Sequence, residues 1–345
     1  MPNEAIYGVV LLAALAHALW NAMVKASSDR LLTLAAIRAV GLVFGCLLIF
    51  FVPMPAPKSW PFLIAAIFVH YAYYALMLRG YRVGDLSQVY PIARGVAPLL
   101  VAALAAALVG EHLTVGQLAA VLLTSTGIVV LAFSRGSPQK GAVPIAIAMG
   151  ATIAGYTFLN GLGVRHGGTV LGYLAWLEIG TGVGVLLVTV HLRRAEMRVF
   201  GPAQGLRGIA AGFLSVGGYL AGLWAITLLP MAPVTAIRET SVVFGAIIGV
   251  VVFRESLGPQ RFAAACLVAA GIMALTLLGA GQAVTVKSFD FKLEQTWRCS
   301  NVTSWHQVDR PECANLQSVL VQKLTSARAA DSTLVLNARP KMGRP

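Results

Sequence analysis

The chain has 345 residues, of which 58% are hydrophobic and 11% are charged. A soluble domain carries about 25% charged residues and needs polar surface to cover its core, so this composition excludes a disordered chain and a soluble globular domain. The formal net charge of +13 does not indicate a nucleic-acid partner, because most of the excess lies in short segments between apolar runs, as in membrane proteins.

Ten apolar runs follow one another along the chain. Each is close to the 20 or so residues that a membrane-spanning helix needs, and the connections between them are short. The sequence therefore predicts an all-α integral membrane protein with ten transmembrane helices. The runs lie near 4–24, 31–52, 60–79, 86–109, 114–133, 142–162, 169–191, 206–228, 232–253 and 259–280.

The C-terminal end differs from this body. Residues 281–345 carry 14 of the 39 charged residues and contain no apolar run of membrane-spanning length. We therefore expect 282–345 to be a polar, disordered tail.

The body contains an internal repeat at an offset of 144 residues. The aligned pairs are Arg94 with Arg238, Gly110-Glu111 with Arg254-Glu255, and Gly127 with Gly271. Each half has five spans, an odd number, so the second half must cross the membrane in the opposite sense. This predicts two inverted five-helix repeats, 1–137 and 138–281, an architecture common among secondary transporters. The alternative is chance similarity between two apolar stretches, but charged residues carry part of the match.

Each half resembles the EamA domain of the drug/metabolite transporter superfamily. The residues that carry the resemblance are Trp20-Asn21 and Lys25 in the first span, Arg38 in the second, Pro98 and Gly110-Glu111 in the fourth, and Arg254-Glu255 in the second half. The second half departs from the pattern, because Val242 stands where Pro98 would be repeated and no Lys matches Lys25. The resemblance implies ten helices, solute transport and both termini inside the cell. The count of Lys and Arg in the connections favours both termini outside, so the orientation stays open.

Four ionisable residues within the spans are the strongest candidates for function: Arg38, Arg94, Arg238 and Glu239. A charge at the bilayer centre costs a few kcal/mol, so it usually faces a cavity or a partner. We hypothesise that Arg94 and Arg238 attract an anionic group such as a carboxylate or phosphonate, which matches the guanidinium fork. Alternatively, each arginine holds helices together. Glu239 could form an ion pair with Arg94, or it could titrate and couple protons to transport. For Arg38 we expect one of the same two roles, coupling or ion pairing.

Prolines and a glycine accompany the two arginines of the repeat. They are Pro91, Gly95 and Pro98 around Arg94, and Pro230 and Pro233 before Arg238. These residues predict helices that are opened near the arginines, as in transporter binding sites.

Polar and aromatic side chains supply further candidates for solute binding: His17, Trp20, Asn21 and Lys25 in the first span, His70 and Tyr74 in the third, and Tyr90 in the fourth. They could stack on and hydrogen-bond an organic solute, or they could pack helices, with Lys25 extending to the membrane surface. Glu178 is a further buried carboxylate without an obvious partner. We expect Glu111 and Glu255, at the ends of spans four and nine, to be structural residues of helix junctions.

The chain contains no Walker motif, nucleophile elbow, zinc-protease signature or cysteine pair with metal-binding spacing. We therefore predict no ATP motor, no catalytic site, no metal and no cofactor. The predicted function is secondary-active transport of a small anionic or zwitterionic metabolite, such as an amino acid or organic acid, as an exporter by alternating access at the repeat interface. Expected partners are the solute and the lipid of a bacterial inner membrane, with protons as a candidate coupling ion and a homodimer as a candidate assembly. The alternative is a membrane-embedded enzyme that acts on a lipid or lipid-linked substrate.

Overall fold

The structure is a computed structural model of the chain, and it describes residues 3–27, 29–83, 86–133, 141–197, 201–252, 254 and 258–279. All of these belong to one compact unit, Met1–Val286. The predicted tail 282–345 and the predicted junction residue Glu255 lie outside the described residues.

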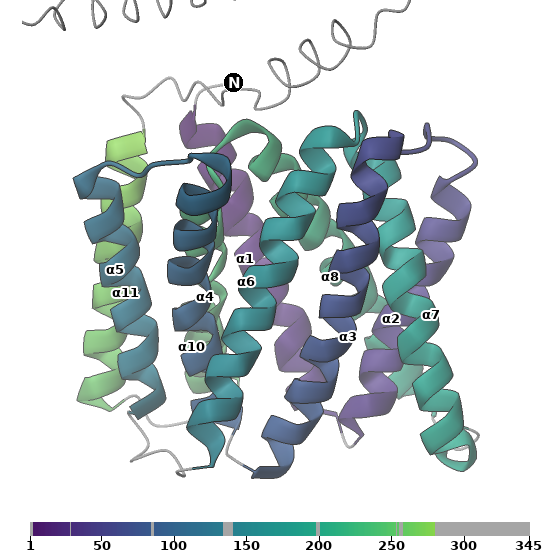
Figure 1. Ribbon diagram of the computed structural model, residues 1–345. Coiled ribbons are helices and arrows are strands. Elements are labelled where there is room, and N and C mark those ends of the chain that lie inside the picture. Colours follow the sequence, from purple (N-terminus) through teal and green to yellow (C-terminus); the bar gives the residue numbers. More distant parts are fainter. Residues whose placement is uncertain are drawn as a thin grey trace, which may run out of the picture. The chain divides into compact units, whose positions relative to one another are not determined.

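The described part of the chain consists of helices with short connections and has no strand (Figure 1). Helices form here because lipid cannot satisfy backbone N–H and C=O groups, which must therefore bond within the segment. The elements are α1 (Asn3–Lys25), α2 (Arg30–Leu48), the short 3₁₀ helix η1 (Pro57–Ser59), α3 (Trp60–Val83), α4 (Leu86–Val109), α5 (Val115–Phe133), α6 (Ala142–His166), α7 (Val170–Met197), α8 (Pro202–Leu228), α9 (Met231–Arg238), α10 (Ser241–Val251) and α11 (Pro259–Gly279).

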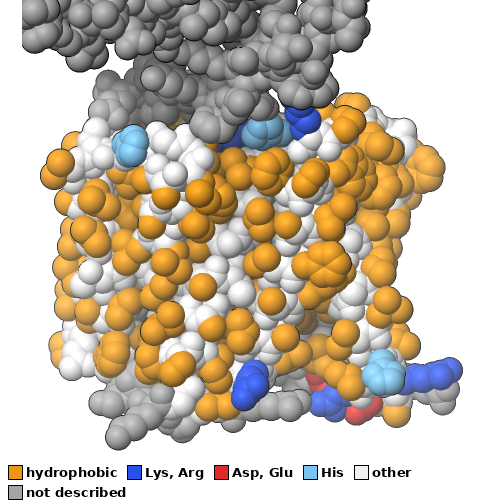
Figure 2. All heavy atoms as spheres, viewed as in Figure 1, with side chains coloured by type: hydrophobic (Ala, Val, Ile, Leu, Met, Phe, Trp, Pro, Cys, Tyr) orange, Lys and Arg blue, Asp and Glu red, His pale blue; other side chains and the backbone are white. Residues whose placement is uncertain are grey.

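The surface of the bundle is apolar around its middle. Within the described residues, nine helical segments are long and apolar enough to cross a membrane, and α11 holds a shorter apolar stretch, Phe262–Leu278. Large hydrophobic side chains such as Phe68, Leu187 and Phe213 are exposed. Figure 2 shows hydrophobic side chains over the middle of the visible face, with charged and His side chains near its upper and lower ends. Soluble monomers do not expose such a continuous apolar surface, so this is an integral membrane protein.

Helices that are distant in sequence pack as pairs: α1 on α8, α2 on α7, α3 on α6 and α5 on α11. In Figure 1 the α5–α11 pair lies at one edge of the bundle, and α2 and α7 lie toward the other. α5 and α11 meet at glycines. A Cβ atom at Gly271 would lie 2.9 Å from the Ala120 carbonyl oxygen, and one at Gly127 would lie 3.0 Å from the Ala264 carbonyl oxygen. Only glycine allows the two backbones to approach so closely.

The prolines of α4 do not open that helix. α4 is a continuous helix that contains Pro91 and Pro98, so the expected opening around Arg94 is not found. Each proline lacks the N–H that would bond the carbonyl oxygen four residues earlier. α4 nevertheless stays helical, and it is packed against α5 and α6. Pro230 is the N-cap of α9 and Pro233 lies in its first turn, where the missing N–H groups have no helical acceptor to lose.

The ninth crossing is interrupted further along than the sequence indicated. The predicted single span 232–253 is two helices, α9 and α10. Between them the N–H of Thr240 donates to the Ile237 carbonyl oxygen at 3.1 Å, a bond to the third rather than the fourth preceding residue. Such bonds tighten a helix locally. The tightened turn directly follows Arg238 and includes Glu239, so it sets the directions of the two charged residues of this crossing.

Candidate functional site

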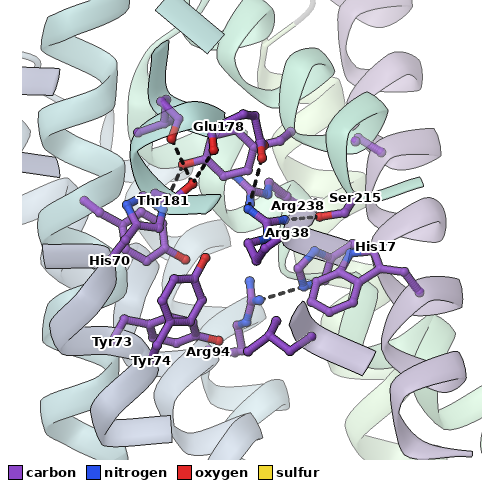
Figure 3. A pocket seen from close by; sticks show the side chains of 17 residues that line it. His17, Arg38, His70, Tyr73, Tyr74, Arg94, Glu178, Thr181, Ser215 and Arg238 are labelled. Carbon is purple, nitrogen blue, oxygen red and sulfur yellow. Dashed lines mark hydrogen bonds and ion pairs between the residues drawn. The ribbon is translucent and has the colours of Figure 1, made fainter. Parts of the chain in front are cut away.

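A cavity lies inside the bundle between eight helices, α1 to α4 and α6 to α9. Its lining is rich in polar and aromatic groups: His17, Trp20, Arg38, His70, Tyr73, Tyr74, Arg94, Tyr156, Glu178, Thr181, Ser215, Tyr219 and Arg238. Figure 3 shows Arg38, Arg94 and Arg238 grouped in the centre, with His70, Tyr73 and Tyr74 on one side and His17 on the other. The cavity therefore brings polar, charged and aromatic groups together inside an apolar bundle.

The three arginines lie near the middle of the crossings. Arg38 and Arg94 are each the ninth residue of their helix, and Arg238 is the eighth residue of α9. At 1.5 Å per residue, each lies roughly 10–12 Å from the start of its helix. Because the hydrocarbon core is about 30 Å thick, the cavity is at a depth where a charge without a partner is costly.

Arg38 of α2 forms an ion pair with Glu178 of α7. Its Nη1 lies 3.2 Å from Glu178 Oε2, and the two side chains are 10% and 2% exposed. Its Nη2 donates to the Ser215 hydroxyl of α8 at 2.7 Å. Glu178, for which the sequence offered no obvious partner, thus has one. The pair joins three helices beside the cavity.

Arg94 of α4 forms a second ion pair, with Glu239. Its Nη1 donates to both carboxylate oxygens, at 2.9 and 3.0 Å, and the side chains are 3% and 2% exposed. Its Nη2 lies 2.6 Å from His17 Nε2, which also lies 3.0 Å from the Tyr90 hydroxyl. The pairing of Arg94 with Glu239 is one of the two roles that the sequence left open for this carboxylate.

Arg238 is arranged differently from the other two arginines. Its guanidinium carbon lies 5.0 Å from the centre of the Tyr219 ring, and a Cβ atom at Gly222 would lie 3.4 Å from its Nη1. Within the described part of the chain it makes no hydrogen bond and no ion pair. A cation over an aromatic face is stabilised by the ring quadrupole, but the donors of the guanidinium remain available to the cavity.

A directed chain of hydrogen bonds includes two lining residues of the cavity, Tyr219 and His70. The Tyr173 hydroxyl donates to Asn160 Oδ1 at 2.9 Å, and Asn160 Nδ2 donates to the Tyr219 hydroxyl at 2.7 Å. The Tyr219 hydroxyl lies 3.4 Å from His70 Nε2, and His70 Nδ1 lies 2.8 Å from the Ala66 carbonyl oxygen. The chain holds the Tyr219 ring, and with it the platform for Arg238, in one orientation.

Of the residues predicted to bind a solute, six line the cavity: His17, Trp20, His70, Tyr74, Arg94 and Arg238. Tyr90 is not among the lining residues, but it bonds His17 and lies under the guanidinium of Arg94 at 4.9 Å. Asn21 and Lys25 are also not part of the lining. Asn21 donates to the His17 carbonyl oxygen of its own helix at 2.7 Å, and Lys25 is exposed at the end of α1.

Ser215, Thr181, Tyr156 and Tyr219 also line the cavity, and they are not among the candidate residues named from the sequence. Tyr156 stacks on His70 with ring centres 4.0 Å apart. Small hydroxyl residues are common in membrane helices and carry no distinguishing signal. The pair of Arg38 with Glu178 could have been suggested by charge balance, because an intramembrane carboxylate needs a cation nearby.

Glu111 connects three helix ends. One carboxylate oxygen accepts from the N–H of Met231 at 3.0 Å, at the start of α9, and the other pairs with Arg165 of α6. Arg165 also donates to the carbonyl oxygens of Ile226 and Leu229 at 2.9 and 3.0 Å. These bonds connect the end of α4, the end of α6 and the α8–α9 connection, away from the cavity.

No family model and no curated protein matches the chain. A solved structure, described only as a crystal structure of protein, superposes with a TM-score of 0.64 at 18% sequence identity, covering 80% of this chain and 96% of that chain. At this level of identity the likeness extends to the fold alone. The helical arrangement of this chain therefore also occurs in an experimentally determined protein.

Proposed function

We propose that the protein is a secondary-active transporter, an exporter of a small anionic or zwitterionic organic metabolite in the EamA group of the drug/metabolite transporter superfamily. The observation that carries the proposal is the cavity near the middle of the crossings, lined by three arginines and by helices from both halves of the chain. A solute that rests at this depth can be exposed to either side by small movements of the surrounding helices. We place the protein in a bacterial inner membrane, with protons as the candidate coupling ion.

Inverted repeats are part of this proposal, and the helix pairs support them. If α1 to α5 correspond to α6 to α11, with α9 and α10 together matching α4, then α2–α7 and α5–α11 pair each helix with its own counterpart. α1–α8 and α3–α6 are then the same contact made twice. Gly110 and Arg254, which the offset of 144 aligns, have φ angles of 70° and 53°. A left-handed conformation is rare for a residue other than glycine, so its recurrence at the aligned position favours a shared ancestry of the halves.

The ion pairing of the two carboxylates beside the cavity favours transport over catalysis. Glu178 and Glu239 are the carboxylates beside the cavity in the described part of the chain, and each is bound by an arginine at 2.9–3.2 Å. A general base needs a carboxylate that is free to accept a proton from a substrate. Paired in this way, the two carboxylates neutralise arginines and order the walls of the cavity.

The test is flux through purified protein in liposomes. A panel of radiolabelled amino acids and organic acids is loaded inside, and efflux is followed with and without a proton gradient. We expect at least one anionic or zwitterionic solute to leave chemically unchanged, and Arg193→Gln, which alters an exposed arginine of the ion pair with Glu196, to leave that flux unaltered. Conversion of a lipid or solute without net flux would support the alternative of a membrane-embedded enzyme.

A further inference from the structure

The charges around the cavity do not balance. Three guanidinium groups and two carboxylates lie beside it in the described part of the chain: Arg38, Arg94, Arg238, Glu178 and Glu239. Two of the arginines are each bound by one carboxylate. This leaves one positive charge, on Arg238, near the middle of the bilayer.

Hydrogen-bond directions indicate that the two histidines add no further charge. A guanidinium can only donate, so His17 Nε2, at 2.6 Å from Arg94 Nη2, is an acceptor and carries no proton. The Tyr219 hydroxyl accepts from Asn160 and has its own proton free for His70 Nε2. His70 Nδ1 donates to the Ala66 carbonyl oxygen. Both imidazoles are therefore neutral in this arrangement, and the net charge of the cavity is +1.

The surroundings of Arg238 suit one negative group attached to a flat body. The guanidinium rests on the Tyr219 ring and its donors are free of protein partners within the described residues. Next to that ring lies His70, which stacks on Tyr156. A carboxylate matches the guanidinium fork, and an aromatic ring can pack against the neighbouring aromatic faces with offset or edge-on geometry.

Resting on the proposed function, we propose that the solute is a singly charged organic anion, a monocarboxylate with an aromatic body, whose carboxylate pairs with Arg238. A monoanion brings the cavity to neutrality. A dianion would leave a negative charge in a low-dielectric site unless it displaced Glu239 from Arg94 or Glu178 from Arg38. A cation would raise the charge to +2. The charge balance thus selects among solutes that share the same body.

The experiment compares four probes with one phenyl body and different charges, measured by calorimetric titration of the purified full-length protein in lipid nanodiscs. The probes are phenylacetate, phenylacetamide, 2-phenylethylamine and phenylmalonate. We expect phenylacetate to bind at least tenfold more tightly than each of the others. Arg238→Gln should weaken phenylacetate binding at least tenfold and leave phenylacetamide binding unchanged, with Arg238→Lys intermediate. The matched control Arg193→Gln should alter neither.

Folding of the variants is checked by thermal unfolding. Because Arg238 makes no hydrogen bond or ion pair within the described residues and carries an uncompensated buried charge, Arg238→Gln should unfold at the same temperature as the wild type or higher. Arg238→Lys keeps the charge if the glutamine variant proves unusable. The proposal is overturned if phenylmalonate binds more tightly than phenylacetate, if no probe binds, or if phenylacetate binding is unchanged in Arg238→Gln.

These outcomes are separate from those of the flux assay. Phenylacetate binding that depends on Arg238, without flux of any solute, would retain the monoanion site and refute transport. Flux of other solutes without a role for Arg238 would retain transport and refute the monoanion site.

Discussion

At the scale of single residues, the cavity depends on how arginines are neutralised. The sequence identified the arginines because charged residues are rare in membrane spans. It offered Arg94 as a partner for Glu239 but did not identify the pair of Arg38 with Glu178, which are 140 residues apart and meet through helix packing. The same limit applies to Arg238. The sequence treated it as equivalent to Arg94, whereas Arg94 has a carboxylate partner in the structure and Arg238 has none among the described residues.

The pair of Arg38 with Glu178 should stabilise the fold mainly because each charge needs the other. Removing one partner leaves a buried charge, so Arg38→Gln and Glu178→Gln should each lower the free energy of unfolding by about 3–5 kcal/mol. The double variant should lose less than the sum of the two, because it leaves no unpaired charge. The free energies of unfolding of the wild type, the two single variants and the double variant are measured in mixed micelles with increasing concentrations of a denaturing detergent. Strictly additive losses would show that the two side chains do not interact energetically.

At the scale of the elements, glycines and breaks decide where helices can meet and turn. The offset of 144 aligned Gly127 with Gly271, and the structure places both in the same contact, between α5 and α11. By contrast, the opening that the prolines suggested in α4 is not found, whereas the ninth crossing is interrupted at Glu239 and Thr240, directly after Arg238. Proline in the first turn of a helix is tolerated, so its position within the helix matters more than its presence.

The α5–α11 contact should not tolerate an added methyl group. In Gly271→Ala the new Cβ would meet the backbone of Ala120, which cannot rotate away, so we expect a loss of about 1–3 kcal/mol in the free energy of unfolding. The matched control is Gly217→Ala in α8, where a Cβ would meet nothing within 4 Å. That variant should be neutral or up to about 1 kcal/mol more stable. Equal effects of the two substitutions would contradict the close approach of α5 and α11.

At the scale of the whole molecule, the sequence predicted the helices well because the bilayer constrains them. A span must be apolar over about 20 residues, and nine segments of the described chain meet this requirement, with a shorter apolar stretch in α11. The cavity was harder to predict. Six of the nine candidate binding residues line it, but Asn21, Lys25 and Tyr90 do not. Asn21 is one helical turn after His17 and Tyr90 is one turn before Arg94, so the helix face can be predicted from the sequence but the extent of the cavity along it cannot.

Alternating access can be tested on the whole molecule without knowing the solute. A residue of the cavity wall must become accessible from each side of the membrane in turn. Thr181 lines the cavity and is 2% exposed, and its hydroxyl donates to the Leu177 carbonyl oxygen of its own helix at 2.8 Å. A cysteine at this position reports on the cavity without removing an ion pair. Leu187, on the same helix and 65% exposed on the apolar surface, is the control position.

The most direct test of the central claim is therefore two-sided labelling of Thr181→Cys with a membrane-impermeant thiol reagent, in a background where Cys46, Cys266, Cys299 and Cys313 are replaced by serine. Sealed vesicles of both orientations are labelled separately. We expect Thr181→Cys to react from either side of the membrane and Leu187→Cys to react from neither. Reaction of Thr181→Cys from one side alone, with and without phenylacetate, would contradict transport through this cavity.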